Sequence, residues 1–159
     1  MRILMIASEA VPFAKTGGLA DVVSALSYAL QKLGHDVRIV MPRYYKIDRK
    51  DLVPIPGAMG VTIGDQEYWT EVFESKLPHS DVPVYFIDHE ESFGRDGLYG
   101  SIFEPDFNDN PKRFSILCHA AFQVCRKQQW IPDIMHSHDW QTALVSVLLK
   151  FNEQYPEFA

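Results

Sequence analysis

The stretch RILMIASEAVPFAKTGGLADVVSALSYALQKLGHDVRIVM, residues 2–41, predicts the architecture of this chain. It begins with Arg2 to Ser8, a short apolar run typical of a strand buried on both faces. Gly17-Gly18 follow, and apolar residues then recur at the spacing of a helix face. These are Leu19, Val22, Val23, Leu26, Leu30 and Leu33. A second short strand, Asp36 to Met41, completes a strand–helix–strand unit, the building block of an open parallel sheet.

The remainder of the chain repeats this alternation with one interruption. Val61–Ile63 and Tyr68–Phe73 flank Gly64-Asp65, a pattern typical of an antiparallel hairpin. Further strands are expected at Val82–Ile87 and Asp133–His136, and helices from Asn110, as N-cap, to Cys125 and from His138 to Phe151. We therefore expect one α/β domain over residues 1–159, in which a three-layer Rossmann-like parallel sheet carries an inserted β-hairpin.

The composition is that of an ordinary globular domain and excludes several classes of protein. Of the 159 residues 47% are hydrophobic, and 15 basic against 21 acidic residues give a net charge of -6, which disfavours a nucleic-acid groove. No apolar run approaches the ~18–20 residues of a membrane span, and no signal-peptide pattern is present. The two cysteines, Cys118 and Cys125, fit core thiols in a reducing compartment, so we expect a cytoplasmic protein without nucleic-acid or membrane partners.

Three loops follow predicted strands and are candidate ligand-binding segments. They are Ser8–Asp21, Asp88–Asn110 and Ser137–Gln141. In open α/β sheets, ligands bind at the carboxyl ends of the strands. We therefore expect these loops to lie together and to form the site.

The first loop contains Lys15-Thr16-Gly17-Gly18 directly before the first helix. Glycine lets the backbone approach a ligand closely, and free N–H groups at a helix start favour an anion. Lys15 adds a positive charge, so this chemistry suits a diphosphate. The spacing is neither the G-x-G-x-x-G dinucleotide fingerprint nor a P-loop. The alternative is a glycine turn needed only for tight packing, with Lys15 in solvent.

The motif His136-Ser137-His138-Asp139, at the junction of the last predicted strand and the third loop, allows two interpretations. Residues two apart on a strand share a face, so the two histidines could ligate a metal together, as in a metal-dependent hydrolase. They could equally form a hydrogen-bonded pair at a strand end. No other histidine has a partner at ligand spacing, and no motif requires a metal. Asp139 is either a helix N-cap or an acceptor for ligand hydroxyls.

The second and longest loop combines aromatic, basic and amide side chains. Arg95 and Tyr99 lie within it, and Asp109 and Asn110 lie at its end. Such a set suits sugar recognition, because rings cover the apolar faces of a pyranose and polar side chains bind its hydroxyls. A structured loop held by its own side chains is the alternative.

Together these motifs resemble the amino terminus of the bacterial glycogen synthases and plant starch synthases. The stretch MRILMIASEAVPFAKTGGLADVVSAL carries the most specific match. The resemblance continues, in family order, through Leu98-Tyr99, Asp109-Asn110, Arg113-Phe114, Pro132-Asp133 and His136-Ser137-His138-Asp139-Trp140-Gln141. It covers essentially the whole chain.

The resemblance implies a GT-B enzyme, in which two Rossmann-like domains face a deep cleft. Glucose would pass from ADP-glucose to the non-reducing end of an α-1,4-glucan with retention of configuration, without a cofactor. The implied substrate-binding residues are Lys15, Thr16, Gly17, Gly18, Asp21 and Tyr99. Asp139 and His138 are implied at the catalytic centre, with His138 mainly in a supporting role. Asn110 and Arg113 would hold the long loop against the helix that follows it.

The chain departs from the family pattern at its end, Phe158-Ala159. Family members continue into a strand with a His-Asn motif and then into a second domain that supplies most of the nucleotide pocket. We therefore expect residues 1–159 to be a truncated amino-terminal domain that is inactive alone, with uncovered apolar surface that favours self-association. Another retaining nucleotide-sugar glucosyltransferase, with UDP-glucose as donor, and a non-catalytic glycan-binding module remain as alternatives.

Overall fold

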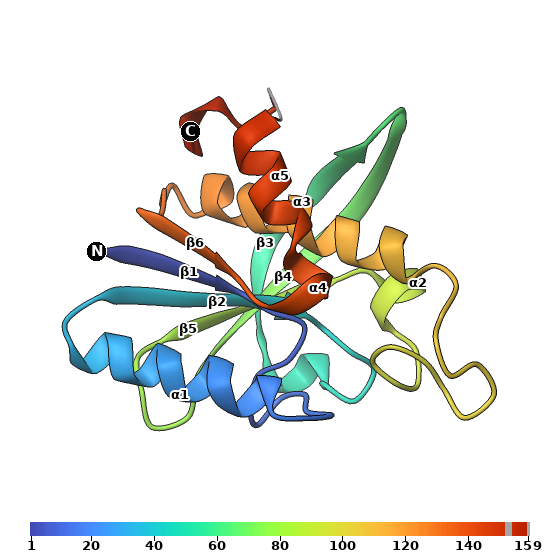
Figure 1. Cartoon of the computed structure of the whole chain (residues 1–159), viewed down its shortest axis with the longest axis horizontal. Helices are drawn as coiled ribbons and strands as arrows, with labels where there is room; N and C mark the ends of the chain where they lie inside the picture. Colours follow the sequence, from blue (N-terminus) through green and yellow to red (C-terminus); the bar gives the residue numbers. More distant parts are fainter. Residues whose placement is uncertain (152–153, 159) are drawn as a thin grey trace.

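A computed structural model describes residues 1–151 and 154–158 of the chain. Figure 1 shows a central sheet with helices on both sides. In chain order the elements are β1 (Arg2–Ile6), α1 (Leu19–Lys32), β2 (Asp36–Pro42), η1 (Arg49–Asp51), β3 (Val53–Ile63), β4 (Gln66–Lys76), β5 (Pro83–Asp88), α2 (Glu90–Phe93), α3 (Asn110–Lys127), β6 (Ile134–Ser137), α4 (Asp139–Thr142), α5 (Leu144–Phe151) and η2 (Pro156–Phe158).

The sheet has six strands in the order β3-β4-β5-β2-β1-β6. Strands β5, β2, β1 and β6 run parallel, and Ile3 of β1 pairs with Val37 on one side and Ile134 on the other. Residues 4–6 of β1 are fully buried. This agrees with the unbroken apolar sequence of β1, which is typical of a parallel strand covered on both faces. The prediction of parallel strands is confirmed for these four, and their carboxyl ends lie along one edge of the sheet.

The helices form the two outer layers. Helix α1 covers one face of the sheet, and α3 and α5 cover the other (Figure 1). Helix α3 is the most deeply buried, with Ile116, Leu117 and Phe122 at 0% exposure. The expected three-layer α/β architecture is therefore present.

The hairpin is longer than the sequence indicates, and it is part of the main sheet. Strands β3 and β4 pair antiparallel, and β4 also pairs antiparallel with β5. The sheet is therefore mixed rather than parallel with a separate hairpin. The first half of β3 escaped prediction because Pro54, Pro56 and Gly57 are poor strand residues. Pro54 pairs with Phe73, and the register shift between Ile55 and Met59 accommodates Pro56 and Gly57 on this edge strand.

Two helix boundaries also differ from the prediction. Asp109 occupies the N-cap of α3, and the side chain of Asn110 binds the Tyr99 carbonyl and Asp106 instead. The expected helix over residues 138–151 is divided at Ala143 into α4 and α5. The long loop over residues 88–109 contains the short helix α2.

Both cysteines are free and buried in α3, as expected of core thiols. Burial raises the pKa of the Cys118 and Cys125 thiols to about 12. Over the described residues, no helix combines the length and the apolar character that a membrane crossing needs.

Candidate functional site

The three predicted ligand-binding segments meet at the carboxyl ends of the parallel strands. Ser8 lies after β1, and a 2.7 Å hydrogen bond joins its Oγ to the hydroxyl of Tyr99 in the long loop. The backbone N–H of His138, after β6, donates to the carbonyl of Ile6 at 3.1 Å. Tyr44, after β2, donates its hydroxyl to the Ser8 carbonyl at 2.9 Å. The predicted convergence of these loops is therefore confirmed.

The glycine bend, residues 15–18, is open at the start of α1. No atom lies within 4 Å of the position that a Cβ at Gly17 or Gly18 would occupy, and neither residue has a positive φ. Within residues 1–151 and 154–158, no acceptor pairs with the N–H groups of Gly17, Gly18 and Leu19. Neither packing nor backbone conformation thus requires glycine here, which disfavours the alternative of a glycine turn needed only for tight packing.

Lys15 borders a cavity of about 320 Å³. Tyr45, Lys46, Arg95 and Leu98 also line it. Lys15 is the residue of the bend that lines this cavity, and the three basic side chains around the cavity, Lys15, Lys46 and Arg95, make it suitable for an anionic ligand.

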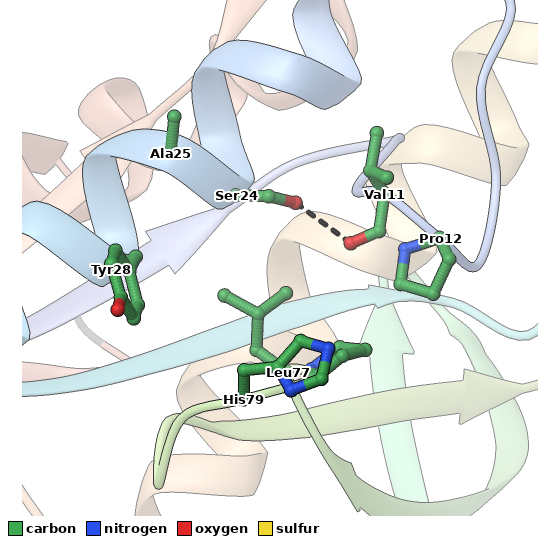
Figure 2. A pocket seen from close by; sticks show the side chains of 8 residues that line it. Val11, Pro12, Ser24, Ala25, Tyr28, Leu77 and His79 are labelled. Atoms are coloured by element: carbon green, nitrogen blue, oxygen red, sulfur yellow. Dashed lines mark hydrogen bonds between the residues drawn. The ribbon is translucent and has the colours of Figure 1, made fainter.

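A larger cavity of about 460 Å³ lies on the other side of the first loop, between α1 and the turn after β4 (Figure 2). Val11, Ser24, Tyr28, Leu77 and His79 are among its lining residues. It contains neither lysine nor arginine, so it does not suit a phosphate.

Lys15 contacts Asp21 across the bend. Its Nζ donates to Oδ1 at 2.8 Å and to Oδ2 at 2.7 Å. The two side chains are 51% and 54% exposed, and exposed ion pairs add little to folding. Phosphate oxygens could therefore replace the carboxylate at little cost, while Asp21 keeps the lysine beside the bend.

Glu9 is a buried residue at this site that the sequence did not single out. Its side chain is buried, with the residue 2% exposed. Its Oε2 accepts from the Thr16 N–H at 2.5 Å, and its Oε1 accepts from the Thr16 hydroxyl at 2.7 Å and from the Tyr99 hydroxyl at 2.5 Å. Thr16, expected among the substrate-binding residues, therefore has both its hydroxyl and its N–H bound to Glu9.

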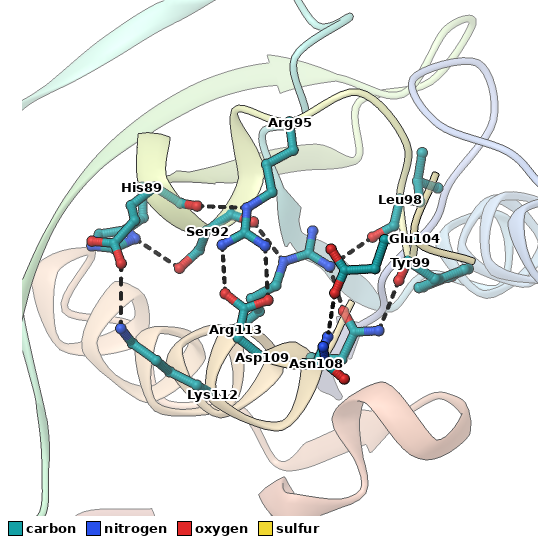
Figure 3. Close-up of polar contacts among 12 residues, drawn as sticks. His89, Ser92, Arg95, Leu98, Tyr99, Glu104, Asn108, Asp109, Lys112 and Arg113 are labelled. Atoms are coloured by element: carbon teal, nitrogen blue, oxygen red, sulfur yellow. Dashed lines mark hydrogen bonds and ion pairs between the residues drawn. The ribbon is translucent and has the colours of Figure 1, made fainter. Parts of the chain in front are cut away.

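The long loop is held by its own side chains (Figure 3). Arg95 forms a two-pronged ion pair with Asp109, in which Nη1 donates to Oδ1 at 2.7 Å. Asn110 donates its amide to the Tyr99 carbonyl at 2.8 Å. Fully buried Arg113 donates to the carbonyls of Ser92 and Leu98 at 2.6 and 3.0 Å. These contacts confirm that Asn110 and Arg113 hold the loop, and they favour the interpretation as a structured loop for most of its polar side chains.

Tyr99 joins this loop to the strand ends. Because a carboxylate only accepts hydrogen bonds, the Tyr99 hydroxyl donates to Glu9 and accepts from Ser8. Burial, and then the bond to Glu9, raises the pKa of Tyr99. Its ring lies 6.0 Å from that of half-exposed Trp140, so these two aromatic side chains lie side by side near the strand ends.

His136 and His138 lie on the same face, as expected, and stack with 4.3 Å between their ring centroids. Over the described residues, no group of three His, Cys, Asp or Glu side chains could hold a metal. The hydrolase alternative therefore lacks the further ligands that it needs.

Asp139 lies after β6 in a left-handed conformation, with φ of 63°. His138, and not Asp139, is the N-cap residue of α4. The Oδ1 atom of Asp139 accepts from the Trp140 N–H at 2.7 Å, and the rest of this exposed carboxylate points to solvent. A strained, non-glycine position at a strand end is typical of functional sites, which favours the ligand-binding interpretation of Asp139.

The free energy of unfolding should fall between pH 7 and pH 5 because of His138. Burial, and then His136, lowers the pKa of His138 to about 4. The unfolded chain, with a histidine pKa near 6.5, therefore binds more protons between pH 6.5 and pH 4, and stability declines as the pH falls through this range. We expect His138 to contribute a loss of about 2 kcal/mol between pH 7 and pH 5.

Urea unfolding of the chain at the two pH values measures this loss, with His138→Gln as the comparison. His89 and His119, whose pKa values burial also lowers, are present in both proteins, so the difference isolates His138. An equal pH dependence in both proteins would contradict the assignment.

Comparisons with known proteins agree with this geometry. A family model described as the starch synthase catalytic domain matches residues 2–159. The chain is 68% identical over 158 residues to the glycogen synthase of Treponema denticola. This match covers 99% of this chain and 32% of that protein. It is 48% identical over 154 residues to glycogen synthase 1 of Geobacter metallireducens, with 94% of this chain and 30% of that protein covered.

Among solved structures, the catalytic domain of starch synthase IV from Arabidopsis thaliana, bound to ADP and acarbose, matches with a TM-score of 0.83 at 31% identity. The match covers 98% of this chain and 31% of that one. The chain thus spans about a third of the length of the relatives that it matches.

Proposed function

Because this chain belongs to the starch synthase catalytic domain family, we propose that it forms part of a retaining glucosyltransferase that moves glucose from ADP-glucose to the non-reducing end of an α-1,4-glucan. The observation that carries this proposal is the glycine bend, which is open to a ligand and flanked by Lys15. Amide groups at a helix start and a lysine together suit the pyrophosphate of a nucleotide sugar. The ADP in the Arabidopsis thaliana relative supports this choice of donor.

In the proposed reaction, negative charge develops on the departing diphosphate. The N–H groups of Gly17 and Gly18 and the Lys15 ammonium are placed in advance to stabilise that charge. Asp139 accepts hydrogen bonds from sugar hydroxyls at the neighbouring strand end. His138 supports it through its backbone, whose N–H and carbonyl both bind the Thr142 hydroxyl, at 2.6 and 2.8 Å.

We further propose that residues 1–159 supply one wall of a GT-B cleft. Electrostatic stabilisation of this kind requires a closed site that excludes water, so the 159-residue chain alone should be inactive. Exposed apolar side chains at the β6 edge, Ile134, Val147 and Phe151, support self-association of the isolated chain. The two free thiols support a cytoplasmic location.

A chimera tests the proposed function. In it, residues 1–159 replace the matching segment of the 68% identical Treponema denticola glycogen synthase. We expect the chimera to transfer labelled glucose from ADP-glucose to glycogen, while the 159-residue chain transfers none. A folded chimera without transfer from either ADP-glucose or UDP-glucose would refute the proposal.

A native gel separates the binding-module alternative. If the chain were instead a glycan-binding module, glycogen in a native gel would retard the 159-residue chain, and Lys15→Ala would not change the retardation.

A further inference from the structure

Glu9 joins two loops that are distant in sequence. It lies in the loop after β1, and its carboxylate binds Thr16 in the glycine bend and Tyr99 in the long loop, 90 residues away. Thr16 and Tyr99 donate their hydroxyls to the same oxygen, Oε1. Within the described residues, no hydrogen bond joins Thr16 and Tyr99 directly, so Glu9 is the link between them.

The electrostatics of Glu9 are unusual for a residue that serves packing alone. In the part of the chain that the structure describes, no lysine or arginine forms an ion pair with it, although it is 2% exposed. Burying an unpaired carboxylate is unfavourable unless hydrogen bonds replace its hydration. Here three donors do so, and each of them belongs to a loop that borders the proposed donor site.

The link determines the position of groups on both sides. Thr16 directly precedes Gly17, so the bond from its N–H to Oε2 holds the backbone at the start of the open bend. Tyr99 is held at its hydroxyl by Glu9 and Ser8 and at its carbonyl by Asn110. The bend and Tyr99 both bind the Glu9 carboxylate, which fixes their positions relative to each other.

We propose that Glu9 is a positioning residue, whose carboxylate holds the phosphate-binding bend and Tyr99 in register for the nucleotide-sugar donor. This inference rests on the proposed function and extends it to a residue that need not touch the substrate. An error of about 1 Å in the position of a binding group can reduce a rate a hundredfold, so the loss of a positioning residue should appear in the kinetics and not only in stability.

The test is a double-mutant cycle in the chimera between Glu9→Gln and Tyr99→Phe. Glutamine keeps the volume but offers one acceptor oxygen to three donors. We expect Glu9→Gln to lower kcat/KM for ADP-glucose at least tenfold, with an unchanged KM for glycogen. In the Tyr99→Phe background, the same change should cost less than threefold, because one side of the link is already absent.

Thr70→Val is the matched control. Thr70 is equally buried and donates its hydroxyl to the Met59 carbonyl at 3.0 Å, but it lies in the hairpin. The substitution Thr70→Val should lower the midpoint of thermal unfolding and leave kcat/KM unchanged. It therefore measures the effect of losing a buried hydrogen bond outside the site.

Two results would overturn the proposal. One is a Glu9→Gln chimera that unfolds at a lower temperature but keeps its kinetics; the other is an equal loss in both backgrounds. If Glu9→Gln does not fold, the cycle is run between Thr16→Val and Tyr99→Phe, whose effects should be non-additive since their hydroxyls share Oε1, and additive effects would then refute the link. An unsubstituted chimera without activity would instead refute the proposed function.

Discussion

Lys15→Ala should lower kcat/KM for ADP-glucose in the chimera by about ten- to over a hundredfold. The lysine borders the cavity beside the glycine bend, where we place the diphosphate. A charge-assisted hydrogen bond to a phosphate contributes about 1.5–3 kcal/mol, and 1.4 kcal/mol corresponds to a factor of ten. The loss should fall on the donor, so the KM for glycogen should not change.

The fold should tolerate this substitution. The partner of Lys15 in the chain is Asp21, and that ion pair is half exposed, so its removal has little effect on stability. The midpoint of thermal unfolding should therefore stay close to that of the unsubstituted chimera, which separates a binding role from a structural one.

Lys76→Ala is a matched control for the loss of an exposed lysine. Lys76 pairs with Asp81 at 2.9 Å on the hairpin, away from the strand ends of the site. Its substitution should change neither donor kinetics nor stability. Donor kinetics that are unchanged by Lys15→Ala in a stable protein would refute the assignment of the bend to the diphosphate.

The layout of the fold could be predicted because it depends on local patterns. Residues 2–41 contain two apolar strands and a helix with an apolar face, and these periodicities follow directly from the geometry of each element. The convergence of the loops then follows from the parallel sheet. The first half of β3 could not be predicted, because its prolines are tolerated only on an edge strand, and edge position is a property of the whole sheet.

The residues of the site also divide into those that a local sequence pattern predicts and those that only the tertiary fold brings together. The glycine bend has a local signal, two glycines and a lysine before a helix, and it lies where that signal places it. Glu9 has none, because an acidic residue after a strand is usually exposed. Its carboxylate binds the hydroxyl of Tyr99, which is 90 residues away, and no local pattern encodes that contact. The N-cap of α3 was misassigned for a similar reason, since the Asn110 side chain is drawn to the Tyr99 carbonyl.

Arg113→Met should lower the free energy of unfolding of the chain by about 3–5 kcal/mol. The guanidinium is 0% exposed and donates to the carbonyls of Ser92 and Leu98 and to the Asn110 side chain (Figure 3). Methionine keeps most of the volume and removes every donor. Two buried acceptors and one part-buried acceptor would then lose this donor, and each buried group left without a partner costs about 1–3 kcal/mol.

Replacing a buried charge by an apolar side chain can also stabilise a protein, but only when its partners are replaced with it. Here the partners include two backbone carbonyls, which no substitution removes, so the loss should dominate. Urea unfolding measures it, with the neighbouring Lys112→Met as control. The Lys112 side chain is 39% exposed and its pair with Glu91 is long, at 3.5 Å, so its replacement should have little effect. If Arg113→Met is as stable as the unsubstituted chain, the long loop is held by other contacts, and the two-pronged pair of Arg95 with Asp109 becomes the first to examine.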